Sequence, residues 1–153
     1  MRTLLVNENI FGSVSHEETF WSTLGRLLPD TQTLALSEFN GDLTARLEEL
    51  KPDLVISNSI LGALPLPDGT KSIVLLQDDF RAMERLLPVT WKTIIKRILR
   101  IPTFYKDSIR KQYEAIGAAD RCVAVSNQVA SSYQVPADII PIGINPELFR
   151  PLG

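Results

Sequence analysis

The sequence has few of the residues on which disulfide-stabilised, metal-binding and histidine-dependent proteins rely. Among its 153 residues there is one cysteine, Cys122, and one histidine, His16. A single cysteine cannot form a disulfide within the chain, and no Cys/His cluster has the spacing of a metal site. A mechanism that needs two histidines is excluded as well. We therefore expect no metal site and no internal disulfide.

Long hydrophobic runs are also missing. The apolar runs are far shorter than the roughly 18–20 residues that cross a membrane. The first residues lack the basic segment and apolar stretch of a signal peptide. The sequence therefore predicts a protein of the reducing cytoplasm.

What is present is a regular alternation of short apolar runs and helical patterns, which is typical of a parallel α/β sheet. The apolar runs are continuous, which indicates that both faces of the sheet are covered. We predict one doubly wound, Rossmann-like α/β domain over residues 1–153, with about six parallel strands and helices on both faces. The expected strands are 3–6, 33–36, 53–58, 72–76, 121–125 and 138–140. The expected helices are 15–28, 41–50, a long region 81–118 broken by Pro88 and Pro102, and a short helix capped by Ser126.

Ligands of such a sheet bind beyond the carboxyl ends of the strands. This rule selects the polar and glycine residues that follow each predicted strand. The candidates for substrate binding are Gly12, Ser13, Asn58, Ser126 and Asn145, and those for catalysis are Gln77 and Asp78.

Two of these connections carry more specific information. The loop at 9–15 has one glycine, whereas a dinucleotide fingerprint needs three, which argues against NAD or FAD. Gly12 could still let a phosphate approach the next helix, although a plain turn explains it too. Asp78 and Asp79 are adjacent and should point to opposite sides, so one could face the cleft while the other caps the next helix.

Positive charge is concentrated in one segment. Residues 81–111 hold nine of the 16 Lys and Arg residues against two acidic ones. Apolar anchors with a basic flank suit an anionic membrane surface, and a core-packed helix with a solvated face is the alternative. No motif for reading nucleic acid is present. The residues predicted to contact a membrane or partner are Trp91, Lys92, Lys96, Arg97 and Arg100.

Two later segments resemble a known family. Residues 118–126 read AADRCVAVS and are similar to the ADxVIAVS strand of GT-B glycosyltransferases of the family-4 type. Residues 140–151 read IPIGINPELFRP and resemble the xIPNGVDxxxFxP segment that ends the N-terminal domain of those enzymes. The preceding order of strands fits the same domain.

The resemblance implies an acceptor-side domain, with the sugar nucleotide held chiefly by a C-terminal Rossmann-like domain that this chain lacks. It also implies transfer to a sugar or lipid-linked acceptor with retention and without an essential metal or cofactor. By this resemblance Gly12 and Ser13 approach the donor diphosphate, Gln77 and Asp78 orient the acceptor hydroxyl, and Asn145 lines the hinge. The isolated chain should then be nearly inactive.

The sequence departs from the family pattern at two places, and two other functions are weighed against the resemblance. The first loop has one glycine where the family commonly has a pair, and Gln77 stands where a histidine is frequent. Gln77 can orient a hydroxyl but cannot act as a base. The alternative is a non-catalytic binding module that docks through 81–111 on an anionic inner-membrane face or a protein. A hydrolase is disfavoured because no G-x-S-x-G elbow is present.

Overall fold

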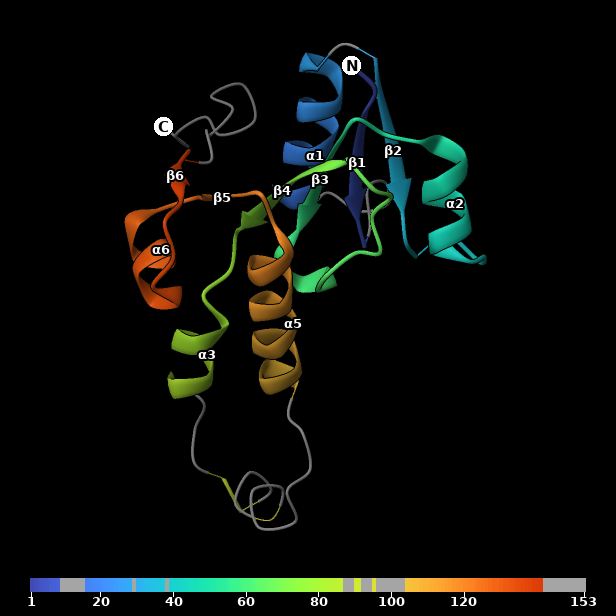
Figure 1. Ribbon diagram of the computed structural model, residues 1–153. Helices are drawn as coiled ribbons and strands as arrows, with labels where there is room; N and C mark the ends of the chain where they lie inside the picture. Colours follow the sequence, from blue (N-terminus) through green and yellow to red (C-terminus); the bar gives the residue numbers. More distant parts are fainter. Residues whose placement is uncertain are drawn as a thin grey trace, which may run out of the picture.

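The fold is built around a parallel sheet of six strands that alternate with helices along the chain (Figure 1). The computed structural model describes residues 1–8, 16–28, 30–37, 39–86, 90–91, 95 and 104–141. The strands are β1 (Thr3–Asn7), β2 (Thr31–Ala35), β3 (Leu54–Asn58), β4 (Lys71–Leu76), β5 (Arg121–Ala124) and β6 (Asp138–Ile139). The described helices are α1 (His16–Leu27), α2 (Leu43–Leu50), α3 (Phe80–Leu86), α5 (Phe104–Ala118) and α6 (Asn127–Tyr133), with a 3-10 turn η1 (Ser59–Leu61).

The strands lie in the order β2-β1-β3-β4-β5-β6, and all of these pairs are parallel. The register places Leu5 beside Ile56, and Ile56 beside Ile73. Parallel neighbours require a crossover connection, which the intervening helices provide. The prediction of a Rossmann-like α/β fold with six parallel strands is therefore confirmed.

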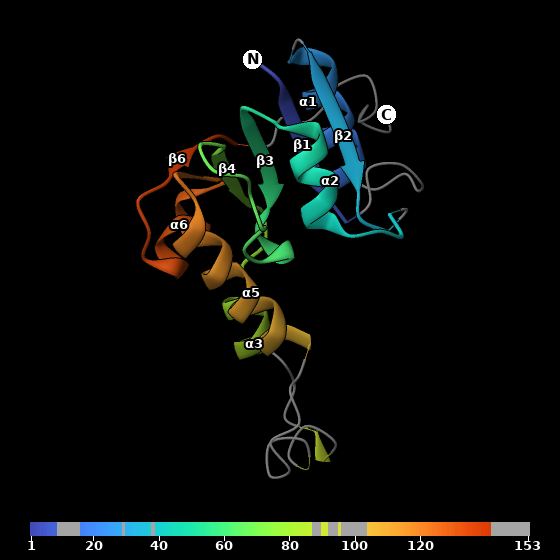
Figure 2. The ribbon, with the colours of Figure 1, turned by 45° about the vertical axis from the view of Figure 1, so that its right-hand side comes forward.

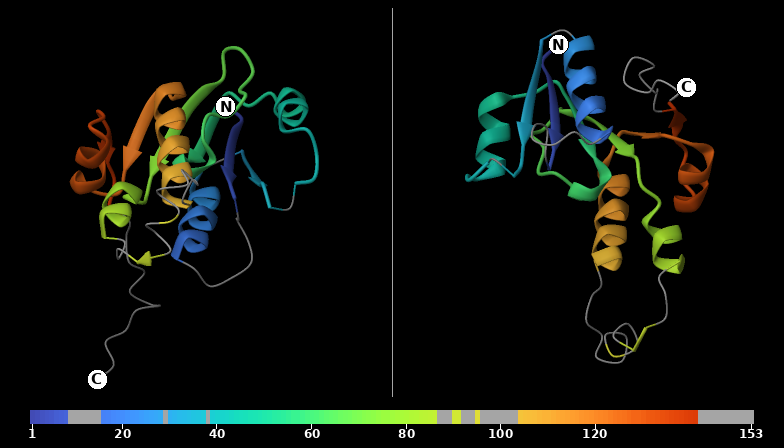
Figure 3. Two further views of the ribbon diagram at one scale, coloured as in Figure 1. Left: turned by 90° about the horizontal axis from the view of Figure 1, so that it is seen from below. Right: turned by 180° about the vertical axis from the view of Figure 1, so that it is seen from behind.

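Different helices cover the two faces of the sheet (Figures 2 and 3). On one face, α1 packs Trp21, which is 0% exposed, against β1, β3 and β4. On the other face, α2 packs Leu47 against β1 and β3. Ala115 of α5 and Tyr133 of α6 join a cluster with β4 and β5 on that same face. The predicted cover of both faces is confirmed.

Several predicted segments differ from the observed ones by one or two residues at an end, and the largest difference is in the helical region 81–118. β2 begins at Thr31 rather than at residue 33, because an edge strand needs only backbone pairing, and Thr31 pairs with Thr3 of β1. The helical region predicted over 81–118 contains α3, which ends at Leu86, and α5, which begins at Phe104. The segment between them lies mostly outside the described residues.

The helices α3 and α5 lie side by side and extend past the edge of the sheet at which the strands end (Figures 1 and 2). α5 also packs on η1, which ends at Gly62 with a φ of +80°. A Cβ placed on Gly62 would lie 3.5 Å from Oε2 of Glu114 and 3.6 Å from Cγ of Lys111. These are ordinary van der Waals distances, so glycine is favoured here because of its positive φ and not for lack of space.

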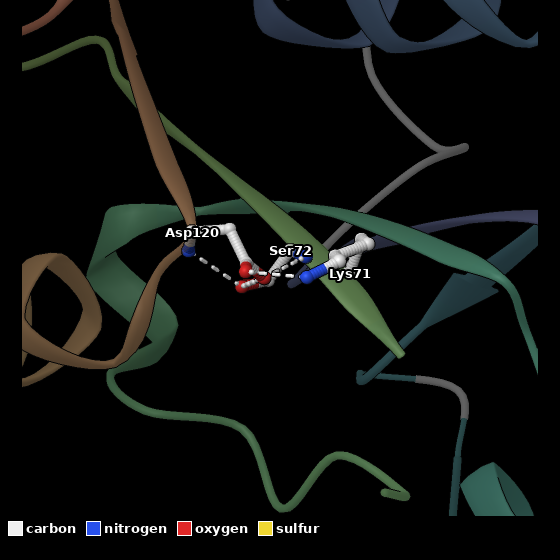
Figure 4. A network of polar contacts seen from close by, with 3 residues as sticks. All are labelled: Lys71, Ser72 and Asp120. Carbon is white, nitrogen blue, oxygen red and sulfur yellow. Dashed lines mark hydrogen bonds and ion pairs between the residues drawn. The ribbon is translucent and has the colours of Figure 1, made fainter. Parts of the chain in front are cut away.

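At the amino edge of the sheet a polar clasp joins β4 to β5 (Figure 4). Asp120 Oδ2 accepts hydrogen bonds from the Ser72 backbone N–H (2.9 Å) and hydroxyl (3.2 Å). The Asp120 N–H donates to the Ser72 hydroxyl (3.1 Å), and Lys71 Nζ lies 3.3 Å from Asp120 Oδ1. The Ser72 backbone hydrogen bond, reinforced by Lys71, lowers the pKa of the Asp120 carboxyl. This clasp supports the register of the two strands.

Candidate functional site

In an open parallel sheet, ligands bind beyond the carboxyl ends of the strands, where the strand order reverses. Here the reversal lies between β1 and β3, because β2 is on one side of β1 and the later strands are on the other. We define the carboxyl-edge site as Asn7, Asn58, Gln77 and Asp78, at the ends of β1, β3 and β4. Gly12, Ser13 and Asn145, which the sequence also places at this edge, lie outside the described residues.

Asn58 and Gln77 are joined by a hydrogen bond whose direction is fixed by the backbone. Asn58 Oδ1 accepts from the Ile60 N–H (3.2 Å), as the N-cap of η1. The amide nitrogen of Asn58 must therefore face Gln77, and it donates to Gln77 Oε1 (2.9 Å). This leaves Gln77 Nε2 as a hydrogen-bond donor, which is buried and has no acceptor within the described part of the chain. Gln77 therefore offers a hydrogen-bond donor and not a base.

The two adjacent aspartates differ in their contacts, and one of them caps the next helix. Asp79 caps α3, because its Oδ1 accepts from the Ala82 N–H (2.9 Å), and it also accepts from the Ser132 hydroxyl (2.7 Å). The Asp78 carboxyl makes no hydrogen bond or ion pair with any residue that the structure describes. It is half-buried, and desolvation raises its pKa. A partly desolvated carboxyl without a partner is typical of a functional group.

The candidate Ser126, which follows β5, and the single cysteine, which lies on β5, both have structural roles. Ser126 caps α6, with its hydroxyl oxygen accepting from the Val129 N–H (3.2 Å), as predicted. Its hydroxyl hydrogen can still be donated to a ligand. Cys122 is buried in β5, and burial raises the pKa of its thiol, which suits a core residue and not a nucleophile.

Sequence reasoning missed several polar residues at this edge. Asn7 ends β1 with its side chain 3% exposed, and its Oδ1 accepts from the Glu8 N–H (2.8 Å). Gln112 is buried in α5, where its amide contacts Ser59 and Tyr133. A signal existed: Ser108, Gln112 and Ala115 have the spacing of one helix face, and all are buried.

The basic segment 81–111 is less uniformly available for a partner than its composition suggests. Arg81 Nη1 donates to the Ser132 carbonyl (2.6 Å) and to the Tyr113 hydroxyl (2.9 Å). Arg110 and Lys111 both pair with Asp107, at 2.7 and 3.4 Å. Of the five residues predicted to contact a membrane or partner, Trp91 is described and is 74% exposed. The other four (Lys92, Lys96, Arg97 and Arg100) lie outside the described residues.

Two hollows, of about 550 and 640 Å³, lie at the amino edge of the sheet, opposite the carboxyl-edge site. The first lies near Arg2 and Thr70, and the second near Asp120 and Pro136. Within the ranges described, no three His, Cys, Asp or Glu side chains are grouped to hold a metal ion. In those same ranges no helix is long and apolar enough to span a membrane. These observations do not identify a ligand site, so we locate the candidate site from the strand order.

Comparison with known proteins finds no match: no protein-family model, curated protein or solved structure is significantly similar to this chain. Inference about function therefore depends on the fold and on the geometry of the carboxyl-edge site.

Proposed function

We propose that this chain is the acceptor-binding half of a retaining GT-B glycosyltransferase, which moves a sugar from a nucleotide-sugar donor to an acceptor hydroxyl. The observation that carries the proposal is Asp78, a half-buried carboxyl without a described partner at the carboxyl end of β4. The similarity of residues 118–126 and 140–151 to the two GT-B segments supports the same assignment.

The chemistry of the two adjacent residues suits a sugar hydroxyl. A hydroxyl both donates and accepts a hydrogen bond. Asp78 can accept from it, and desolvation makes the carboxylate a stronger proton acceptor than one in water. Asn58 fixes the orientation of the Gln77 amide, which leaves its buried N–H donor without an acceptor in the described part of the chain. Gln77 is therefore assigned to binding, and the acidic role falls to Asp78.

The donor is assigned chiefly to a second Rossmann-like domain. Gly12 and Ser13 would approach its diphosphate from this side, Asn145 would line the hinge, and Ser126 would add a hydroxyl at the end of β5. Because half of the transition-state contacts would come from the second domain, residues 1–153 alone should show negligible transfer. Binding of an acceptor, and not turnover, is the informative measurement on this chain.

The test is an NMR titration of ¹⁵N-labelled chain with methyl and octyl glycosides of common hexoses, and separately with nucleotide sugars. We expect a glycoside to shift the amide resonances of residues 58–60 and 77–79, and nucleotide sugars to bind more weakly. Asp78→Asn removes the carboxylate with little change in shape and should reduce glycoside affinity at least tenfold. Asp42→Asn is the matched control, because Asn caps α2 as well as Asp does.

Three results would contradict the proposal. The first is that no glycoside shifts the resonances of the carboxyl-edge site. The second is that Asp78→Asn binds as tightly as the Asp42→Asn control. The third is robust sugar transfer by residues 1–153 alone, which would show that no second domain is needed.

A second function, docking on an anionic membrane, is favoured by exposed apolar side chains on and after α3. Leu86 is 82% exposed and Trp91 is 74% exposed, and Met83 and Ile95 are also exposed. Basic residues surround them in the sequence, and each Lys or Arg near an anionic surface contributes about 1 kcal/mol. Since Arg81, Arg110 and Lys111 have partners within the protein, the attraction is assigned to Arg85 and to the basic residues at 92–100.

Vesicle flotation separates this function from the first. Vesicles of phosphatidylcholine with phosphatidylserine should carry the chain at low salt and release it at high salt. Leu86→Glu with Trp91→Glu should abolish flotation. Leu27→Glu, at a leucine of α1 that is 73% exposed, should leave it unchanged. No flotation at low salt, or equal loss with Leu27→Glu, would contradict docking through this segment.

A further inference from the structure

A buried polar cluster lies behind the carboxyl-edge site, where η1, the β4–α3 connection, α5 and α6 meet. Its centre is Gln112 of α5, which is 1% exposed. Gln112 Nε2 donates to the Ser59 hydroxyl (3.0 Å) and to the Asp78 backbone carbonyl (3.1 Å). The Tyr133 hydroxyl of α6 donates to Gln112 Oε1. Ser59 and Tyr133 are buried too, so the whole cluster is shielded from water.

The orientation of the Gln112 amide follows from its partners. A backbone carbonyl can only accept, so the nitrogen of the amide must face Asp78. The oxygen then faces Tyr133, whose hydroxyl must donate. Burial, aided by the negative charge of Asp79, raises the pKa of Tyr133 to about 12, so this hydroxyl keeps its hydrogen at any physiological pH. Turning the amide over would place its oxygen against the Asp78 carbonyl and break that hydrogen bond, because only the two hydroxyls can exchange the roles of donor and acceptor.

The connection that carries Asp78 is therefore held on both sides. Gln112 holds the carbonyl of Asp78, and the next residue, Asp79, is held by the Ala82 N–H and the Ser132 hydroxyl. Arg81 binds the Ser132 carbonyl and fixes α3 to α6. In this connection the described protein leaves two groups without a hydrogen bond, the Asp78 carboxyl and the buried Nε2 of Gln77. A chain segment pinned this closely around an unpartnered carboxyl is what a preorganised binding group requires.

We propose that Gln112, held by Tyr133, is a positioning residue that fixes the Asp78 carboxyl in its half-buried place for contact with a ligand. The ligand contact itself rests on the function proposed above, whereas the positioning is a property of the chain alone. A leucine or methionine at this place in α5 would fill the core without holding the Asp78 carbonyl. The hydrogen bond to the Asp78 carbonyl therefore accounts for a polar residue at this buried position.

The alternative is that Gln112 only satisfies polar groups in the core. Both accounts predict that its loss destabilises the fold, so stability does not separate them. They differ in what they predict for the pKa of the Asp78 carboxyl after Gln112 is replaced. If Gln112 holds Asp78 against the protein, its loss lets the carboxyl move into water, and the pKa of Asp78 falls toward the ordinary value of an aspartate. If the role is only structural, Asp78 titrates as before in every variant that folds.

The experiment is a ¹³C NMR titration of the Asp78 side-chain carboxyl in the wild type, Gln112→Met, Tyr133→Phe and Ser72→Ala. Ser72→Ala is the control, because it removes partly buried hydrogen bonds at the opposite edge of the sheet. We expect a lower titration midpoint in Gln112→Met, a smaller decrease in Tyr133→Phe, and none in Ser72→Ala. If Gln112→Met does not fold, Tyr133→Phe is measured in its place by the same titration. It removes a single hydroxyl and is the smaller perturbation of the fold.

The proposal is overturned if Asp78 titrates identically in all folded variants, or if Ser72→Ala moves its midpoint as far as the network variants do. A glycoside titration of the same samples separates this inference from the proposed function. A shifted midpoint without glycoside binding to any sample supports the positioning and rejects the acceptor site. Glycoside binding with an unshifted midpoint supports the acceptor site and rejects the positioning.

Discussion

Replacing Gln112 with methionine keeps a side chain of similar size and removes all three of its hydrogen bonds. The hydroxyls of Ser59 and Tyr133 and the carbonyl of Asp78 then lose a partner, in a region where Ser59 and Tyr133 are almost fully buried. A buried polar group left without a partner costs about 1–3 kcal/mol. The two hydroxyls can rotate toward other acceptors, so we expect a total cost of about 2–4 kcal/mol.

The size of the effect can be checked by a double-mutant cycle. Tyr133→Phe alone leaves the buried Gln112 oxygen without a donor and should cost about 1–3 kcal/mol. In the Gln112→Met background the same change removes a phenol that is already without its partner, so it should cost much less. The two costs should therefore fall short of additivity by about 0.5–3 kcal/mol.

Urea unfolding followed by fluorescence and far-ultraviolet circular dichroism gives the four free energies, with buried Trp21 as the reporter of α1 and its sheet face. Strictly additive costs would refute the reasoning, because they would mean that the amide and the phenol do not depend on each other. A cost for Gln112→Met below about 0.5 kcal/mol would refute it too, since buried partners would then have been lost without penalty.

Three further predictions concern the rest of the fold. Ser72→Ala removes both hydrogen bonds of the Ser72 hydroxyl with Asp120 and should lower the free energy of unfolding by about 1 kcal/mol, which corresponds to a fall in Tm of about 2–4 °C. An unchanged Tm would contradict a stabilising role for the clasp. Because the pKa of Asp120 is lowered from 3.8, its ionised form stabilises the fold above that pH, and this is lost as the pH falls through the lowered value. Asp120→Asn should therefore flatten the acid limb of stability against pH, and an unaltered limb would contradict this sign. Gly62→Ala, at a φ of +80°, should lower the free energy of unfolding by about 1–3 kcal/mol, whereas Gly117→Ala in α5 should raise it by about 0.5–1 kcal/mol. Equal effects of the two substitutions in urea unfolding would contradict this account.

The part of the fold that could be predicted is the part governed by local pattern. Continuous apolar runs such as that of β3 predict a strand buried on both faces, and the structure confirms it. The caps at Asp79 and Ser126 follow from residue type and position, since short polar side chains satisfy the first N–H groups of a helix. The predicted start of β2 at residue 33 was wrong by two residues, because pairing at a sheet edge does not require apolar side chains and the strand begins at Thr31.

The buried network could not be predicted because it depends on tertiary contacts. Gln112 is far in the sequence from Ser59 and from Asp78, and a glutamine in a helix with many charged neighbours indicates a solvated face. The net charge of 81–111 likewise does not show which of its charged side chains are available to a partner. Arg110 and Lys111 share the partner Asp107 one helical turn away, and Arg81 is bound to the Ser132 carbonyl. Composition counts charges but does not show which of them are paired.

The most direct test of the central claim is the carboxyl ¹³C resonance of Asp78 while a glycoside that binds is titrated to saturation. We predict that this resonance moves in step with binding, while that of Asp79, whose carboxyl already accepts hydrogen bonds from Ala82 and Ser132, stays nearly constant. An Asp78 resonance that does not move at saturation would contradict the assignment of this carboxyl to the acceptor, and with it the proposed function of the carboxyl-edge site.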